Sequence, residues 1–129
     1  GLTEQEQDDL DEYRRVVDVR LDHVGQMREA GAKLVAGSDA SWGYYGLGEY
    51  QYEVEEHVTA GMSPMEAIVS ATSDSAKSCW IDDTVGTLEP GKQADVLVVD
   101  GDPSQNIKAL WNVADVFQGG GRVDRGKYV

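Results

Sequence analysis

The chain has 129 residues, enough for one domain of ordinary size but too few for a complete (β/α)8 barrel, which takes roughly 250. Hydrophobic residues make up 40% and charged residues 27%, a composition that excludes a disordered tail, and no apolar run approaches the roughly 20 residues of a membrane span. The formal charge of -13 repels phosphate groups, so we expect neither nucleic acid nor a membrane as a partner.

The start of the chain and its single cysteine bear on where the protein works. Gly1–Gln5 has neither the basic nor the apolar region of a signal peptide. Because residue 1 is not Met, we expect further sequence upstream of it. Cys79 alone forms no internal disulfide and suits a reducing compartment, so the expected location is the cytoplasm.

The first segment, from Thr3 to about Ala30, is predicted to form one long amphipathic helix. Its apolar residues recur at steps of three and four, which places them on one stripe, and charged residues fill the remaining surface. Gly31 is typical of the position after a helix end. The stripe consists of Leu10, Tyr13, Val17, Leu21, Val24 and Met27.

A short apolar run, Leu34–Ala36, follows the Gly31 turn and suits a buried strand of a parallel sheet. Asp39 stands at its carboxyl end, and the Gly-rich, aromatic stretch Ala40–Gly48 predicts a loop. An aspartate in this place can simply cap a turn. It can also be functional, because catalytic groups of barrel enzymes lie at the carboxyl ends of strands.

Two shorter helices are predicted next, over Tyr52–Ala60 and over Ser63–Lys77. The second begins with serine at the N-cap, proline at the first helical position and Glu66 two residues later, which is the pattern of a capping box. Beyond Cys79 the pattern changes to β. Glu89–Lys92 predicts a type II turn, and strands are predicted over Ala94–Asp100 and Val113–Gln118.

The remaining reactive side chains make no complete catalytic constellation. His23 and His57 are isolated on predicted helices, so we expect both at the surface and assign neither to a metal. Cys79 has no basic neighbour in the sequence, which favours a buried or idle thiol over a nucleophile. The loop aromatics either line a pocket or cover the core, and the sequence leaves both open. They are Trp42, Tyr44 and Tyr45.

Four segments, in one order, resemble the metal-dependent amidohydrolase superfamily. Their match runs from about residue 31 to residue 121. The ending Asp100–Pro103 and the stretch Val116–Gly120 resemble most the imidazolonepropionase-like and prolidase-like branch. The four segments are Gly31–Ala40, similar to the motif of the eighth barrel strand; Glu53–Ile68, similar to the helix–turn–helix that follows; Ser70–Ala76, similar to a small-residue helix; and Val85–Pro103, similar to the signature near the carboxyl terminus.

The resemblance implies an α/β fold that is the C-terminal part of an amidohydrolase TIM barrel plus strands of a small accessory β-sandwich. Residues 1–80 would form the last β/α unit of the barrel and the trailing helices. Residues 81–129 would supply the C-terminal strands of the sandwich, whose other strands come from the amino-terminal part of a full-length member. Asp95 is then expected to be a hydrogen-bonded structural acid.

The resemblance also implies a function for Asp39. It matches the strand-eight aspartate that ligates a divalent metal, with zinc expected, and that handles the proton of the attacking water. The substrate would be a small molecule with an amide, cyclic amide or peptide-like C–N bond, and Ala40–Gly48 would border its pocket. The family's other metal ligands have no counterpart in this chain, so we expect the isolated chain to be inactive.

The alternative function belongs to another class, a non-catalytic domain that reuses the same segment for association or scaffolding. An incomplete barrel leaves a strand edge and helix stripes uncovered, and a second copy of the chain would cover them. This alternative predicts a homo-oligomer.

Overall fold

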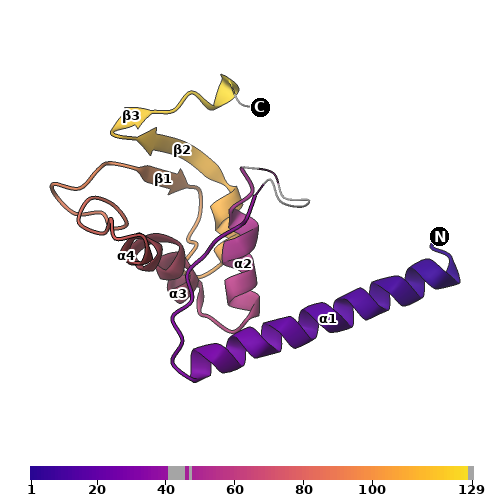
Figure 1. Cartoon of the computed structure of the whole chain (residues 1–129). Coiled ribbons are helices and arrows are strands. Elements are labelled where there is room, and N and C mark those ends of the chain that lie inside the picture. Colours follow the sequence, from indigo (N-terminus) through magenta and orange to yellow (C-terminus); the bar gives the residue numbers. More distant parts are fainter. Residues whose placement is uncertain (41–45, 47, 128–129) are drawn as a thin grey trace.

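In the computed structural model, helices come first along the chain and a small sheet follows, as the sequence predicts (Figure 1). The structure describes residues 1–40, 46 and 48–127. The elements are helices α1 (Glu4–Glu29), α2 (Gln51–Thr59) and α3 (Pro64–Val69), the π-helical turn η1 (Ser70–Asp74), helix α4 (Ser75–Ser78), strand β1 (Val96–Val99), the 3-10 helix η2 (Ile107–Trp111), strands β2 (Val113–Gln118) and β3 (Gly121–Arg122), and the 3-10 turn η3 (Arg125–Lys127).

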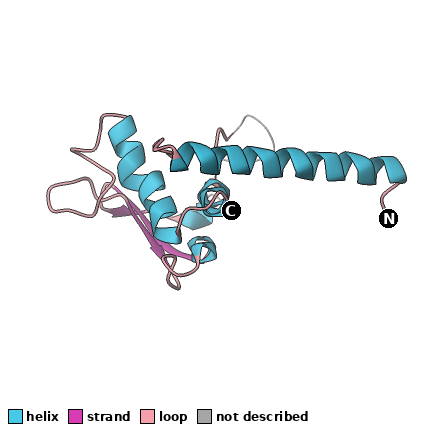
Figure 2. Cartoon of the chain, turned by 90° about the horizontal axis from the view of Figure 1, so that it is seen from below, coloured by secondary structure: helices cyan, strands magenta, loops and turns pink. Residues whose placement is uncertain are grey.

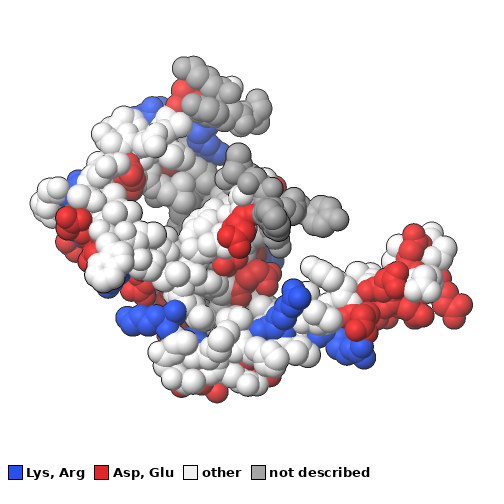
Figure 3. Space-filling model, viewed as in Figure 1, with Lys and Arg blue, Asp and Glu red and all other residues white. Residues whose placement is uncertain are grey.

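Helix α1 projects from the rest of the molecule and contacts it near its carboxyl end (Figures 1 and 2). The predicted helix is confirmed, and Thr3 and Glu6 close its first turn as a capping box. None of its 26 residues, all of them described, is buried, and Tyr13 on the apolar stripe is 66% exposed. Acidic residues gather at its outer end (Figure 3). Across the described part of the chain, no helix has both the length and the apolar character needed to cross a bilayer.

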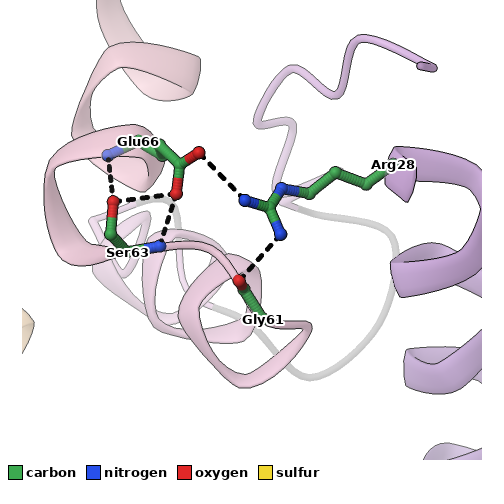
Figure 4. A network of polar contacts seen from close by, with 4 residues as sticks. All are labelled: Arg28, Gly61, Ser63 and Glu66. Carbon is green, nitrogen blue, oxygen red and sulfur yellow. Dashed lines mark hydrogen bonds and ion pairs between the residues drawn. The ribbon is translucent and has the colours of Figure 1, made fainter. Parts of the chain in front are cut away.

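The last turn of α1 is fastened by Arg28 (Figure 4). Its guanidinium donates to the carbonyl oxygen of Gly61 (2.9 Å) and pairs with the carboxylate of Glu66 (2.9 Å). The same carboxylate accepts from the backbone N–H of Ser63 at 2.8 Å and completes the capping box predicted for α3. One arginine therefore joins α1 to the turn between α2 and α3.

The hydrophobic core lies between α2, α3 and η2. Apolar side chains from both halves of the chain meet there, and the rings of Tyr52 on α2 and Trp111 of η2 pack edge to face, with ring centroids 4.7 Å apart. This packing joins α2 to α3 and to η2. The buried members are Val54, Met62, Ala67 and Ile107, and Leu34, Val58, Ile68, Ala71 and Leu110 pack against them.

The sheet is antiparallel, in the order β1-β2-β3. The strand predicted over Val113–Gln118 is confirmed with the same bounds, and β1 is shorter than the predicted Ala94–Asp100. Asp95 accepts from the N–H of Gly119 at 2.7 Å, which lowers the pKa of its carboxyl and ties the β2–β3 turn to β1. Asp95 is therefore hydrogen-bonded, as expected.

The strand predicted over Leu34–Ala36 is wrong for this chain, because residues 32–39 run as irregular backbone. A parallel strand needs neighbours for its backbone hydrogen bonds, and the three strands that the structure describes pair with one another elsewhere. The expected burial of this run is confirmed only in part. Leu34 is half-buried and packs against the core, whereas Val35 is exposed.

The turn region between α4 and β1 packs closely against η1 at Gly86. Gly86 has a φ of +93°, and a Cβ there would lie 2.6 Å from the Cβ of Ala76. Gly91 has the same φ of +93° in the predicted turn, which the hydrogen bond from Lys92 N–H to the Glu89 carbonyl (3.2 Å) confirms. A Cβ at Gly91 would meet no atom within 4 Å.

These two glycines make a matched pair for a test of packing. Both Gly86→Ala and Gly91→Ala strain a left-handed backbone, but only Gly86→Ala also forces a methyl group against Ala76. We expect Gly86→Ala to lower the free energy of unfolding by about 1–3 kcal/mol more than Gly91→Ala, measured by urea denaturation. Equal losses in the two variants would show that the close packing at Gly86 is not present.

The Arg28 contact also predicts a dependence on pH. Hydrogen bonds from the Ser63 N–H and hydroxyl, and then the contact with Arg28, lower the pKa of Glu66 from 4.5 to about 2. Because the folded pKa lies below the unfolded one, the stability that this carboxylate contributes is complete above about pH 4.5 and is lost as pH falls to about 2. The difference in unfolding free energy between wild type and Glu66→Gln should therefore shrink over that range. The control is Glu29→Gln, an exposed acid beside Arg28, and the same convergence in both variants would contradict the assignment.

Candidate functional site

Asp39, the predicted catalytic and metal-binding residue, stands at the end of the irregular segment that follows α1. Its side chain is exposed and its φ is +46°, a left-handed conformation that aspartate adopts more readily than most residues. The N–H of Ala40, the next residue, donates to the hydroxyl of Ser38 at 3.4 Å. The three aromatic residues predicted to line a pocket or cover the core, Trp42, Tyr44 and Tyr45, lie outside the described residues.

The backbone just before Asp39 is held by α2 and η1. The N–H of Gly37 donates to Oε1 of Glu53 (3.2 Å), and the hydroxyl of Tyr50 donates to the carbonyl of Ala36 (3.1 Å). The N–H of Ala36 donates to the carbonyl of Ser70 at 3.5 Å. These contacts replace the ladder bonds that a strand would have made, and they fix where the chain presents Asp39.

A buried polar network lies behind this segment. His57 is 8% exposed and Ser70 2% exposed, and His57 Nδ1 lies 2.7 Å from Ser70 Oγ. Because the Ser70 hydroxyl donates to the carbonyl of Ala67 (2.7 Å), Nδ1 of His57 is the donor to Ser70. Nε2 of the same ring lies 3.6 Å from Oε1 of Glu53. We call these three residues the Glu53–His57–Ser70 network.

The prediction that His57 lies at the surface is therefore wrong. His57 follows Val54 by three residues, so the two side chains share the face of α2 that is turned toward α3. A signal for this was present in the sequence, because His57 follows Val54 by three residues and Val58 follows Val54 by four, which is the spacing of one helix face. His23 is exposed, as predicted. Cys79 is an exposed free thiol, so of the two expected states, buried or idle, the buried one is wrong.

The charges of the site follow from these contacts. The hydrogen bond with His57, joined by the bond from the Gly37 N–H, holds the pKa of Glu53 below its usual value although burial opposes it. Burial raises the pKa of Tyr50, and the nearby Glu53 charge adds to that shift. Glu53 is therefore a carboxylate at neutral pH, and the Tyr50 hydroxyl keeps its proton as a donor.

The described residues do not form a metal site by themselves. Among them, no three His, Cys, Asp or Glu side chains come together to hold an ion. A catalytic zinc typically has three protein ligands. The exposed carboxylate of Asp39 fits one ligand position, and a complete site would need ligands from outside the described part of the chain.

Comparison with known proteins gives one family match and several partial likenesses. Residues 9–123 match the model of the Amidohydrolase family. A stretch of 52 residues is 44% identical to adenine deaminase 1 of Latilactobacillus sakei, covering 40% of this chain and 9% of that protein. The matched stretch thus spans less than a tenth of the length of this relative.

Solved structures match a larger share of the chain. A structure described as a Xaa-Pro dipeptidase with bound methionine in the active site has a TM-score of 0.74 and 36% identity, over 80% of this chain and 25% of that one. A structure of a putative prolidase from Bifidobacterium longum has a TM-score of 0.77 and 34% identity, over 81% of this chain and 26% of that one. The chain spans about a quarter of each, and the prolidase-like resemblance expected from the sequence is confirmed.

The buried network predicts a difference between two serines with similar local bonds. The Ser70 and Ser78 hydroxyls both donate to a carbonyl three residues earlier, but only Ser70 is buried and accepts from a histidine. Ser70→Ala should lower the free energy of unfolding by about 1–3 kcal/mol because it leaves Nδ1 of His57 unpaired. Ser78→Ala should stay within about 0.5 kcal/mol of wild type in the same urea titration. Equal, small effects would argue against the network.

Proposed function

Because the chain belongs to the amidohydrolase family, we propose that it is the carboxyl-terminal part of an enzyme that hydrolyses C–N bonds of small molecules. We call that longer protein the intact enzyme. The observation that carries the proposal is the place of Asp39, an exposed carboxylate at the end of a backbone segment that α2 and η1 hold at three points. A carboxylate presented in this way is suited to accept a proton from water.

The division of the chain follows from the same proposal. Residues 1–80 would complete the TIM barrel with its last β/α unit, and residues 81–129 would add strands to the accessory β-sandwich. The irregular backbone of Leu34–Ala36 supports this, because an apolar segment without ladder partners here would gain them beside the neighbouring barrel strands. The likeness to two solved structures, of which the match covers only about a quarter, supports it as well.

In the intact enzyme, Asp39 would supply one ligand to a divalent metal, with zinc the expected ion, and the remaining ligands would come from upstream residues. When bound, such a metal supplies a water molecule whose pKa is near 7. The Asp39 carboxylate would accept the proton of the attacking water. As the water oxygen bonds to the substrate carbon and the C–N bond breaks, Asp39 would pass this proton to the departing nitrogen.

The comparisons favour an amide or peptide-like substrate. A deaminase and a dipeptidase both break C–N bonds, but the likeness to the dipeptidase covers 80% of this chain and the likeness to the deaminase 40%. The stretch that precedes α2, Ala40–Gly48, would border the substrate pocket. A panel of one proline dipeptide, one cyclic amide and one aminopurine would separate these classes in a single hydrolysis assay.

A second candidate function, association without catalysis, is favoured by one observation. All 26 residues of α1 are described and none is buried, so its apolar stripe is available to another surface. In the intact enzyme the rest of the barrel would cover that stripe, and in the alternative a second copy of the chain would. Analytical ultracentrifugation of the intact protein distinguishes the two, because the association model requires a dimer that Tyr13→Lys dissolves.

The catalytic role is tested by Asp39→Asn in the intact enzyme, with Asp83→Asn as a control that removes an exposed acid elsewhere. Asp39→Asn should lower kcat by roughly 100-fold or more and lower the bound metal, because an amide is a poor proton acceptor and a weaker ligand. Asp83→Asn should leave both values unchanged. Wild-type turnover and metal content in Asp39→Asn would refute the assignment.

A further inference from the structure

We propose that Glu53 is the positioning residue for Asp39, and that His57 and Ser70 hold its carboxylate in place. This inference rests on the proposed function, since it gives Asp39 the reacting carboxylate. Glu53 itself would touch neither metal nor substrate. It would act through the backbone that carries Asp39.

The first step is the contact between Glu53 and Gly37. Oε1 of Glu53 accepts from the Gly37 N–H at 3.2 Å, two residues before Asp39. A glycine has more backbone freedom than any other residue, so an unrestrained Gly37 would let the following peptides swing. The bond to Glu53 restricts the backbone at Gly37, and this restricts the direction of the Asp39 side chain two residues later.

The second step is that Glu53 is itself restrained. Nε2 of His57 lies 3.6 Å from the oxygen that receives the Gly37 bond. The ring of His57 is buried and its other nitrogen is bonded to Ser70 Oγ at 2.7 Å, so a ring flip would break a buried hydrogen bond. The carboxylate of Glu53 therefore rests against a side chain that has one favoured orientation.

The third step is that Ser70 contacts both His57 and the backbone that leads to Asp39. Ser70 holds His57 with its hydroxyl, and its carbonyl accepts from the N–H of Ala36, the residue before Gly37. The hydroxyl of Ser75, the residue after η1, also donates to that carbonyl at 2.6 Å, and π-helical turns such as η1 are frequent at functional sites. The network thus bonds to the backbone of both Ala36 and Gly37, the two residues that precede Ser38 and Asp39.

A purely stabilising role for Glu53 makes a different prediction from a positioning role. In Glu53→Gln the side-chain oxygen can still accept from the Gly37 N–H, because an amide oxygen is an acceptor like a carboxylate oxygen. Glu53→Ala loses the acceptor. If Glu53 acts by holding Gly37, Gln rescues and Ala does not; if it acts only by its charge, Gln and Ala behave alike.

The test is the affinity of the intact enzyme for Zn²⁺, measured by titration of the metal-free protein. Glu53→Ala should weaken Zn²⁺ binding roughly 10- to 100-fold, the usual effect of removing a group that orients a ligand. Glu53→Gln should bind Zn²⁺ nearly as tightly as wild type. The matched control is Glu56→Ala on the same helix, which removes an exposed acid from the same small hollow beside Ser38 and should change nothing.

The outcomes separate this inference from the proposed function. If Asp39→Asn leaves Zn²⁺ affinity unchanged, the proposed function fails and the positioning role falls with it. If Asp39→Asn weakens binding but Glu53→Ala matches Glu56→Ala, only the positioning role is overturned. It is overturned as well if Glu53→Gln weakens binding as much as Glu53→Ala.

A second measurement covers the case in which Glu53→Ala does not fold. Hydrogen exchange of the Gly37 amide, followed by NMR in the 129-residue chain, should be slow in wild type, Glu53→Gln and Glu56→Ala. A Gly37 amide that exchanges in wild type as fast as those of exposed loop residues would overturn the proposal without any further variant.

Discussion

The backbone of Ala36 and Gly37 carries polar groups that need partners, and α2 and η1 supply them through side chains and one carbonyl. A barrel strand would meet this need with ladder bonds to two neighbours. In this chain the hydrogen-bond partners are the Tyr50 hydroxyl, the Glu53 carboxylate and the Ser70 carbonyl. The position of Asp39 depends on these three bonds. The position of Asp39 is therefore set by the positions of α2 and η1.

The placement of α2 depends in turn on residues far away in the sequence. Val54 packs with Ile107, so the 3-10 helix between the first two strands supports the helix that carries Glu53 and His57. On the other side, Arg28 joins α1 to the turn that begins α3. The segments before and after residue 80, which the resemblance assigns to two domains, share this one core. Support for Asp39 thus extends through most of the chain.

Much of this could be predicted from local sequence patterns. Capping residues and turn glycines act over a few positions, so the start of α3 at Ser63, the turn at Gly91 and the strand β2 were all predictable. The state of Leu34–Ala36 was not, because a strand exists only with neighbours, and no described strand pairs with this run. Burial of His57 was missed for a related reason. It depends on Ser70, which lies 13 residues away and offers its hydroxyl only after α2 and α3 have packed.

The central claim is that a backbone segment held by Glu53 presents Asp39 to a metal, and a crystal structure of the intact enzyme grown with Zn²⁺ tests it most directly. The account predicts an Asp39 oxygen about 2.0–2.2 Å from the ion, with the Gly37 N–H still bonded to Glu53. A metal held entirely by other residues, with the Asp39 carboxylate turned away from it, would contradict the account.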